Sequence, residues 1–577
     1  MHRSFRVLVA TLILASVDAI AAQPSTFDAR FDIRDDVLIK TPDGATLSAA
    51  VIKPRSATGR LSTLLKFDIY VRADRTFDEA KFYAEHGYAV VLADARGKRL
   101  SPDSIVPYET EARDTHAVLD WITKQSWSDG RVGMWGGSYQ GFTAWAATKR
   151  MHPALKTIAV SAAAIPGLGL PMYNNVFLNA NYAWAFHVSN NKFTDESVYA
   201  TPQRWQKATR DWFASGRAYR EFDRIDGTPN PFLQRWLTHP AYDGYWQAMV
   251  PYGRDFAQID IPVLTITGYY DDGQISALHY LKEHVAHNRN AQHYLVIGPY
   301  DHLGTHAANK AQELRGYKID VVAQFSTPQL TLEWMDYVLK DRPKPSILAA
   351  AINYEVMDAN EWRHAGSLRE LQSGRKRFYF SDAKTGERHL LSADRPAARG
   401  SIEQIVDFRN RRLFHNFHSY PFPIVQDPLQ YITEVLFESA PFAVPVVVSG
   451  SFAGELAITI NKRDVDVGVA VYEEMPDGKL FHLGYALQRA SYAHDASKRN
   501  LLTAGKKTAI PFETTFVSKQ LQAGSRLLLL LDVSKNPGAQ VNYGTGKDVS
   551  DETVADAGEP LSIRWHNDSF VDVPFDR

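Results

Sequence analysis

The alternation of strand-like and helix-like segments between residues 31 and 165 is the feature that most constrains the fold of this chain. Strand-like runs stand at 61–67, 88–94, 132–135 and 158–161. Apolar residues at helical spacing lie between them, at 116–124 and 142–147. Strands that are apolar on both faces and alternate with helices are typical of a parallel sheet covered on both sides. The sequence therefore predicts an α/β fold.

The alternation is interrupted between residues 166 and 250. This stretch is rich in Tyr, Trp, Phe and Asn, and 202–214 has a helical pattern. Strand-like runs resume at 262–267 and 294–297, and an amphipathic helix is expected at 330–339. We expect a helical cap at 166–250, inserted between two core segments at 23–165 and 251–342.

The pattern of predicted secondary structure changes after the sequence Arg-Pro-Lys-Pro at 342–345, which is expected to be a linker. Short strands with almost no helix follow, at 377–380, 444–448, 455–461, 465–472 and 527–532. The strand at 444–448 is expected to end at a turn formed by Ser449 and Gly450. Residues 343–577 therefore predict a C-terminal β-sandwich of the jelly-roll type.

The first 22 residues have the pattern of a secretory signal peptide. Arg3 and Arg6 precede an apolar run at 7–17, and the sequence Ala-Ile-Ala at 19–21 is a small-x-small cleavage site. The alternative is a buried N-terminal helix. Since no later stretch has the composition of a membrane span, we expect a secreted or periplasmic protein.

The composition excludes several classes of function. The chain has 577 residues and no cysteine, which excludes disulfides, thiolate metal sites and a cysteine nucleophile. Lys and Arg number 64 against 65 Asp and Glu, so the net charge of −1 gives no electrostatic reason to expect a nucleic-acid partner. Neither the composition nor the charge settles the oligomeric state.

The strongest local motif is the sequence Gly-Met-Trp-Gly-Gly-Ser-Tyr-Gln-Gly at 133–141, placed where a strand ends and a helix begins. A glycine two residues before Ser138 permits a sharp turn that exposes the serine hydroxyl as a nucleophile. Gln140 replaces the second glycine of the usual G-x-S-x-G pattern, and Gly141 follows it. The alternative is a glycine-rich turn whose serine caps the helix.

A serine nucleophile needs a histidine base and a carboxylate that orients it. Asp271 follows the strand at 262–267, and His302 follows the strand at 294–297. Both come after Ser138 in the order acid, then histidine, which is the order this fold requires. Asp272 remains a competing candidate for the acid. We therefore predict a triad of Ser138, Asp271 and His302.

The sequence resembles the CocE/NonD-type serine hydrolases, the family of cocaine esterase, α-amino acid ester hydrolases, cephalosporin acylases and X-Pro dipeptidyl peptidases. The matching motifs are G-G-S-Y-Q-G around Ser138, G-Y-Y-D ending at Asp271 and G-P-Y-D-H ending at His302. The resemblance extends over nearly the whole chain, with further likeness at 94–97, in the cap, at 333–336 and at 464–469.

The resemblance implies an α/β-hydrolase core, a two-part oxyanion hole and no metal or organic cofactor. One part is the backbone N–H of Tyr139, which follows the nucleophile. The other is a tyrosine hydroxyl after the first strand, a place held here by Tyr70. Ile69 stands where the family commonly has proline, and a packed or surface tyrosine is the alternative. Asp94 and Arg96 are expected to make structural contacts.

Substrate preference is less constrained by the sequence. Amino acid ester hydrolases hold a substrate ammonium with carboxylates, two of which lie two and three residues after the catalytic acid. Gly273 and Gln274 occupy those positions here. This disfavours recognition of a free α-amino group, so we expect an esterase or acylase that acts on small-molecule esters or amides. The alternatives are an X-Pro dipeptidyl peptidase and a non-catalytic binding protein on a hydrolase scaffold. The cap offers four aromatic candidates for an acyl pocket: Tyr173, Phe177, Trp184 and Trp212.

Overall fold

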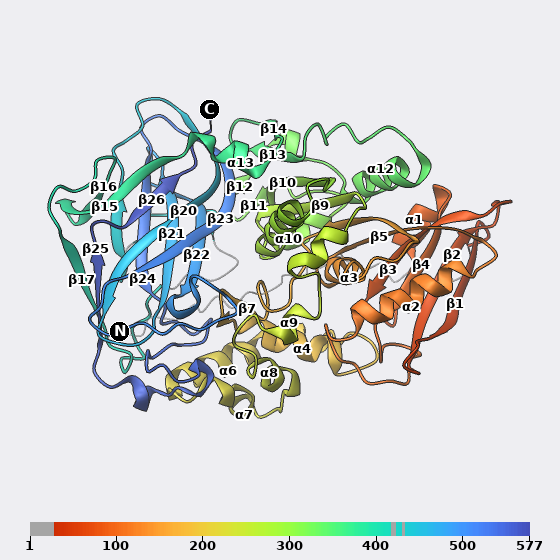
Figure 1. Cartoon of the computed structure of the whole chain (residues 1–577), viewed down its shortest axis with the longest axis horizontal. Coiled ribbons are helices and arrows are strands. Elements are labelled where there is room, and N and C mark those ends of the chain that lie inside the picture. The colour runs from red at the N-terminus through yellow and green to blue at the C-terminus, as the bar shows by residue number, and fades with distance from the viewer. Residues whose placement is uncertain (1–27, 417–422, 430–432, 577) are drawn as a thin grey trace.

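The computed structural model describes residues 28–416, 423–429 and 433–576, and the predicted signal peptide at 1–22 lies outside the described residues. A ten-stranded mixed sheet organises the α/β region (Figure 1). Its strands lie in the order β1 (Phe31–Lys40), β2 (Thr46–Pro54), β4 (Ala89–Asp94), β3 (Leu61–Asp68), β5 (Ser128–Gly137), β6 (Leu155–Ser161), β9 (Val263–Tyr270), β10 (His293–Asp301), β13 (Ile352–Val356) and β14 (Glu361–Ala365). Neighbouring strands from β4 to β13 run parallel, while β1, β2 and β14 pair antiparallel at the two edges. The predicted α/β fold is confirmed.

Helices cover both faces of this sheet. The side chains of Val90 and Leu92 pack with α1 (Asp78–Glu85) and α12 (Thr327–Lys340) on one face. The opposite face, which includes Val91, packs with the three helices α2 (Glu111–Thr123), α3 (Tyr139–Ala147) and α10 (Gln274–His287). Because both faces are buried, the strand ends are the places where this sheet can expose polar side chains.

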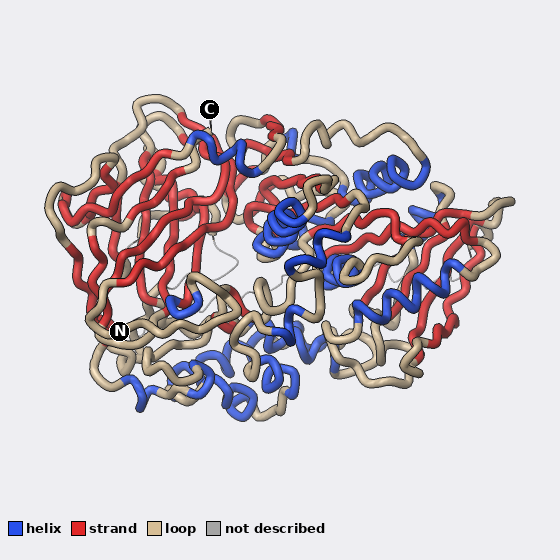
Figure 2. Tube along the Cα trace, in the orientation of Figure 1, coloured by secondary structure: helices blue, strands red, loops and turns tan. Residues whose placement is uncertain are grey.

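The region between β6 and β9, where the sequence predicts a helical cap, is mainly helical (Figure 2). It contains a short hairpin and six helices: β7 (Met172–Tyr173), β8 (Val176–Phe177), α4 (Ala180–Ser189), α5 (Ser197–Ala200), α6 (Pro202–Ser215), α7 (Phe222–Asp226), α8 (Pro231–Trp236) and α9 (Gly244–Gln247). The cap also contacts the C-terminal domain, because the buried Arg489 side chain donates to the Asn175 carbonyl at 2.6 Å.

The C-terminal domain is rich in β-structure, as predicted. Its strands are β15 (Lys376–Thr385), β16 (Arg388–Ser392), β17 (Ser401–Val406), β18 (Val425–Gln426), β19 (Val435–Glu438), β20 (Val446–Ile460), β21 (Asp466–Glu474), β22 (Leu480–Arg489), β23 (Thr508–Leu521), β24 (Arg526–Val533), β25 (Leu561–His566) and β26 (Phe570–Val573). The expected turn at Ser449 and Gly450 is wrong. β20 continues through both residues, and its register against β23 shifts between Ser451 and Ala453. Gly450 lies inside the strand with a φ of 139°, next to this irregularity, and does not mark the strand's end.

The sheet topology also differs from the predicted boundary at residues 342/343. β13 and β14 lie beyond that boundary, yet both belong to the ten-stranded sheet. The whole of β13 is buried, and it pairs parallel with β10. The proline-containing segment at 342–345 is therefore a connection inside the α/β region, and the change of domain comes after β14, near α13 (Leu368–Leu371). No helix within the described ranges is both long enough and apolar enough to cross a bilayer.

Candidate active site

Ser138 occupies the tight turn between β5 and α3. Its backbone has φ 57° and ψ −122°, a conformation that residues with a side chain rarely adopt. Two glycines make the turn possible: a Cβ on Gly136 would lie 2.4 Å from the Gln140 Cβ, and one on Gly141 would lie 2.8 Å from the Ala163 Cβ. A serine held in this strained strand-to-helix turn has the backbone geometry that a nucleophile elbow requires.

The sheet topology brings the three candidate triad residues to one edge. β5, β6, β9 and β10 are parallel neighbours, so their carboxyl ends meet. Ser138 follows β5, Asp271 follows β9, and His302 follows β10 as the first residue of α11 (His302–His306). The turn before Ser138 also lies against α11, because a Cβ on Gly137 would come within 2.9 Å of His306 Nδ1.

Asp271 is buried and held in place by the backbone and side chains around it. Thr267 Oγ1 donates to its Oδ2 at 2.7 Å, and the Gly273 N–H donates to its Oδ1 at 2.8 Å. His302 Nδ1 lies 3.0 Å from the same Oδ1. Burial raises the pKa of Asp271, and the hydrogen bond with His302 opposes that rise. This carboxylate is therefore fixed in an orientation that points at the imidazole.

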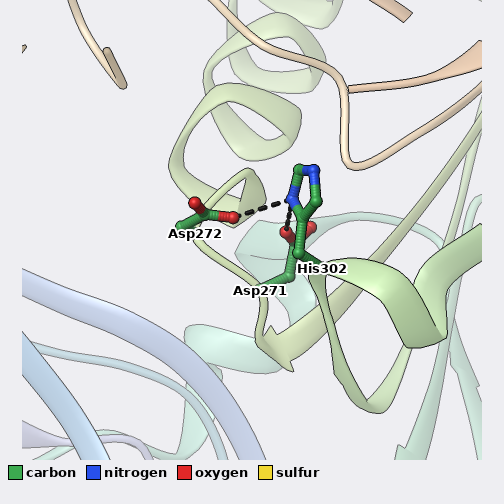
Figure 3. A group of neighbouring side chains, drawn as sticks. All are labelled: Asp271, Asp272 and His302. Carbon is green, nitrogen blue, oxygen red and sulfur yellow. Dashed lines mark hydrogen bonds and ion pairs between the residues drawn. The ribbon is translucent and has the colours of Figure 1, made fainter. Parts of the chain in front are cut away.

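Asp272 contacts the same ring nitrogen from a second side (Figure 3). Its Oδ1 lies 2.7 Å from His302 Nδ1, and its side chain is 42% exposed. Burial favours the neutral imidazole, but the charges of Asp272 and Asp271 and their hydrogen bonds outweigh it and raise the pKa of His302 well above its usual value. The structure thus brings both of the competing aspartates to His302.

The same cluster is the one place in the described residues where three ligand atoms of a possible metal site come together. Oxygens of Asp271 and Asp272 and a nitrogen of His302 lie within 4.8 Å of one another. The separations of 2.7 and 3.0 Å from Nδ1 are those of charge-assisted hydrogen bonds. We therefore interpret the cluster as a hydrogen-bonded imidazole with two carboxylates.

Tyr70 follows β3, and its hydroxyl lies next to the candidate nucleophile. The Asp68 carboxylate accepts the backbone N–H of Tyr70 at 2.8 Å, which fixes the turn after the strand. The Trp184 indole N–H donates to the Tyr70 hydroxyl at 3.0 Å, and the Ser138 side chain lies close enough to that hydroxyl to lower its pKa. Burial raises the pKa of Tyr70 to about 12, so the phenol keeps its proton and remains a donor.

Tyr139 is the first residue of α3, where backbone N–H groups have no acceptor within the helix. Its ring is buried and stands edge-on to the ring of Tyr70, with centroids 6.2 Å apart. Its hydroxyl donates to the Glu111 carboxylate and accepts the Tyr108 backbone N–H at 3.1 Å. These contacts anchor the side chain of Tyr139 in the core.

The four cap aromatics occupy different places. Trp184 alone of the four contacts Tyr70, and it stacks on Tyr108 at 5.2 Å. Trp212 and Phe177 are buried in the core. The Tyr173 hydroxyl donates to a backbone carbonyl of β22 at 3.4 Å, toward the C-terminal domain. Of the predicted pocket residues, Trp184 is therefore the one placed at the candidate site.

The position three residues after Asp271 has a structural role. The Gln274 amide donates to the Gly268 and Phe516 carbonyls at 2.9 Å each, and its oxygen accepts the Phe516 N–H at 2.7 Å. Gln274 is fully buried by these contacts. It joins the loop after β9 to β23 of the C-terminal domain, so its amide is occupied within the protein.

Asp94 and Arg96 make structural ion pairs, as expected. Asp94 is buried and pairs with Arg75 at 3.0 Å. Arg96 pairs with Asp114 at 2.5 Å and with Asp43 at 3.0 Å. These contacts tie the segment after β4 to α2 and to the β1–β2 connection.

Sequence reasoning missed two groups that support the site. Glu111, which anchors Tyr139, lies on an amphipathic helix, where a glutamate normally indicates a solvent-facing position. His306 lies one turn after His302, with ring centroids 5.7 Å apart. Burial lowers the pKa of His306 to about 3, so this neighbour stays neutral. The spacing of four residues between the two histidines on one helix was the available signal for His306.

Two family models and one curated relative match the sequence over most of its length. The model of the X-Pro dipeptidyl-peptidase (S15 family) matches residues 43–304, and that of the X-Pro dipeptidyl-peptidase C-terminal non-catalytic domain matches residues 348–566. Cocaine esterase of Rhodococcus sp. (strain MB1 Bresler) is 25% identical over 567 residues, covering 91% of this chain and 95% of the esterase.

Solved structures share the fold. An α-amino acid ester hydrolase superposes with a TM-score of 0.76 at 20% identity, covering 97% of this chain and all of that one. A CocE/NonD family hydrolase from Staphylococcus aureus gives a TM-score of 0.67 at 15% identity over 94% of each chain. The two domain matches, together with a curated relative aligned over nearly the full length, show that the protein belongs to the CocE/NonD family of serine hydrolases.

Proposed function

We propose that the protein hydrolyses ester or amide bonds of small acyl substrates through a Ser138–His302–Asp271 triad and an acyl-enzyme. The observation that carries the proposal is the convergence of a strained elbow serine with a histidine whose Nδ1 is held by a buried carboxylate, at one edge of a parallel sheet. With Nδ1 occupied, the Nε2 atom of His302 is the nitrogen available as a base.

In the proposed acylation step, the Ser138 Oγ forms a bond to the substrate carbonyl carbon while His302 Nε2 takes the hydroxyl proton. The imidazolium then donates that proton to the leaving alcohol or amine as the scissile bond breaks. Asp271 keeps the ring in the required tautomer and stabilises the imidazolium. A water molecule, deprotonated by His302, next attacks the acyl-enzyme and releases the acid and the free serine.

The oxyanion that forms during each attack needs preorganised donors. The backbone N–H of Tyr139 and the hydroxyl of Tyr70 are the two donors that flank Ser138 in this proposal. The raised pKa of Tyr70 supports its role, since a phenol that titrates near pH 12 is protonated throughout the working range. One such donor contributes about 3 kcal/mol to the transition state.

The acyl group is proposed to be apolar or aromatic. Trp184, Tyr108 and Tyr139 form an aromatic cluster beside Tyr70, in which Trp184 stacks on Tyr108. Gly273 and Gln274 provide no carboxylate for a substrate ammonium, and Gln274 is occupied by contacts with β23. These features favour an esterase or acylase without a free α-amino group in its substrate.

An X-Pro dipeptidyl peptidase is the second candidate, and the specific observation in its favour is the description of both matching domain models. The two activities are separated by a panel of p-nitrophenyl esters, β-lactam side-chain amides and Xaa-Pro-anilides. We expect rapid cleavage of esters or side-chain amides. Rapid cleavage of Xaa-Pro-anilides alone would establish the peptidase instead.

The experiment that tests the proposed nucleophile is Ser138→Ala, assayed with the best substrate of that panel. Loss of all but a trace of turnover, with an unchanged thermal unfolding transition, is the expected result. Hydrolysis at the original rate in this variant would contradict the proposal. If the wild type itself hydrolyses no substrate of the panel, a binding protein on a hydrolase scaffold would be favoured.

A further inference from the structure

Two carboxylates share one nitrogen of His302, although a catalytic triad needs one. Asp272 Oδ1 lies 2.7 Å and Asp271 Oδ1 lies 3.0 Å from Nδ1. Nδ1 therefore makes a hydrogen bond with Asp271 and an ion pair with Asp272 (Figure 3). Both side chains come from consecutive residues of the loop after β9, and they approach the ring from different directions.

The two carboxylates are held in different ways. Asp271 is completely buried, and it accepts hydrogen bonds from Thr267 and Gly273 in addition to His302. Asp272 is 42% exposed, so it is the more solvent-accessible of the two carboxylates. Asp271 therefore has the fixed geometry that orients a ring, whereas Asp272 contributes mainly a second negative charge.

We infer that Asp272 is a second positioning carboxylate, which clamps the imidazole together with Asp271 and sets the pH at which His302 becomes an effective base. This inference rests on the proposed function, since it requires His302 to be the base for Ser138. It assigns a role to Asp272 that differs from that of Asp271: the buried residue fixes the tautomer, and the exposed residue tunes the charge.

The charges around His302 support this division of roles. From the loop after β9, the two aspartates favour the protonated ring. From α11, His306 is neutral at working pH, since its pKa is about 3. Arg315 donates to the Tyr270 carbonyl at 3.4 Å, just before the two aspartates.

Three more distant charged groups, Lys66, Lys310 and Glu79, influence the pKa of the neighbouring His306. On the remaining side, the charge of Asp272 also raises the pKa of the uncharged Tyr70. Of the two charged groups in direct contact with His302, Asp272 is the one that is partly open to solvent. Its removal is expected to leave the buried Asp271 and its hydrogen bonds in place.

The sign of the effect follows from the role of His302. A base must be unprotonated, so a raised pKa moves the acidic limb of the activity profile to higher pH. Removing the charge of Asp272 lowers the pKa of His302 and moves this limb to lower pH, by about one unit for a lost charge at hydrogen-bond distance. The imidazolium formed during catalysis also loses stabilisation, so the plateau rate falls.

The experiment compares the wild type with Asp272→Asn, Asp271→Asn and Asp301→Asn. Asp301 is the matched control, because it precedes His302 and caps α11 by accepting the Gly304 N–H at 2.9 Å, a role that asparagine also fills. Two rates are measured from pH 4.5 to 9: kcat/KM for the best p-nitrophenyl ester, and covalent modification by a fluorophosphonate.

We expect Asp272→Asn to shift the acidic limb of both profiles downward by about one pH unit, with a plateau loss of about tenfold or less. Asp271→Asn should lower the plateau by about 10⁴-fold, as expected for the loss of the residue that fixes the tautomer. Asp301→Asn should leave the limb where it is. In 1 M NaCl the shift caused by Asp272→Asn should shrink, because a partly exposed charge is screened.

Two results would overturn the inference. An acidic limb that does not move in Asp272→Asn would show that Asp272 is an ordinary surface carboxylate. A plateau loss in Asp272→Asn as large as that in Asp271→Asn would show that Asp272 is itself the triad acid. Failure of the proposed function is recognised separately, because Ser138→Ala would then remain active and the fluorophosphonate would not label Ser138.

Discussion

Glu111 provides a prediction whose magnitude follows from the structure. This residue is 1% exposed at the start of α2, and its carboxylate accepts the Tyr139 hydroxyl and the Thr110 N–H, the latter at 3.0 Å. Burial raises the pKa of Glu111 from its ordinary value of 4.5 to about 7. The folded protein therefore binds this proton more tightly than the unfolded chain does.

The sign of the pH dependence follows from that difference. Since the folded pKa lies above the unfolded value, the contribution of Glu111 to the free energy of unfolding is complete below pH 4.5 and is lost as the pH rises through about 7. At 1.36 kcal/mol for each pKa unit, the loss is about 3 kcal/mol by pH 8. Glutamine mimics the protonated acid, with one donor and one acceptor, and does not titrate.

The assay is urea unfolding of the wild type and Glu111→Gln at pH 5, 6, 7 and 8. We expect the stability of the variant relative to the wild type to rise by about 2.5 kcal/mol across this range, because part of the total loss has already occurred by pH 5. Glu333→Gln, at an exposed position of α12, is the control and should show a constant difference. A constant difference for Glu111→Gln as well would refute the account of Glu111 as a buried carboxyl that titrates near neutrality.

Three further predictions concern the site. Tyr70→Phe should lower kcat by about a hundredfold with little change in KM, because one oxyanion donor is lost; unchanged turnover would remove Tyr70 from the oxyanion hole. Trp184→Phe keeps an aromatic ring but removes the donor to the Tyr70 hydroxyl, so steady-state kinetics should show a smaller loss of kcat than in Tyr70→Phe; an equal or larger loss would mean that Trp184 acts independently of Tyr70. Dialysis against a chelator should leave kcat/KM unchanged, and recovery of lost activity by an added divalent cation would instead identify the His302 cluster as a metal site.

The α/β fold could be predicted because its signals are local. The run at 88–94 is apolar on both faces, and the turn around Ser138 needs glycine at Gly136 whatever the rest of the chain does. The order of Ser138, Asp271 and His302 along the chain then follows from the parallel topology. Each of these features depends on a few neighbouring residues, so the sequence alone reveals it.

Other features depend on packing between distant segments, and the sequence alone does not reveal them. The contact of Asp272 with His302 depends on the path of the loop after β9, which Gln274 fixes against β23 about 240 residues later in the chain. β20 continues through Ser449 and Gly450 because neighbouring strands pair with both halves of it. Glu111 is buried because the Tyr139 hydroxyl provides a partner that no local pattern indicates.

Covalent labelling tests the central claim, that Ser138 is the nucleophile activated by His302, most directly. Folded protein is treated with a fluorophosphonate at pH 8, and the modified peptide is located by mass spectrometry. The account predicts a single adduct on Ser138, formed in step with the loss of hydrolysis and greatly slowed in a His302→Ala variant. An adduct on another residue, or full hydrolytic activity in protein fully labelled at Ser138, would contradict it.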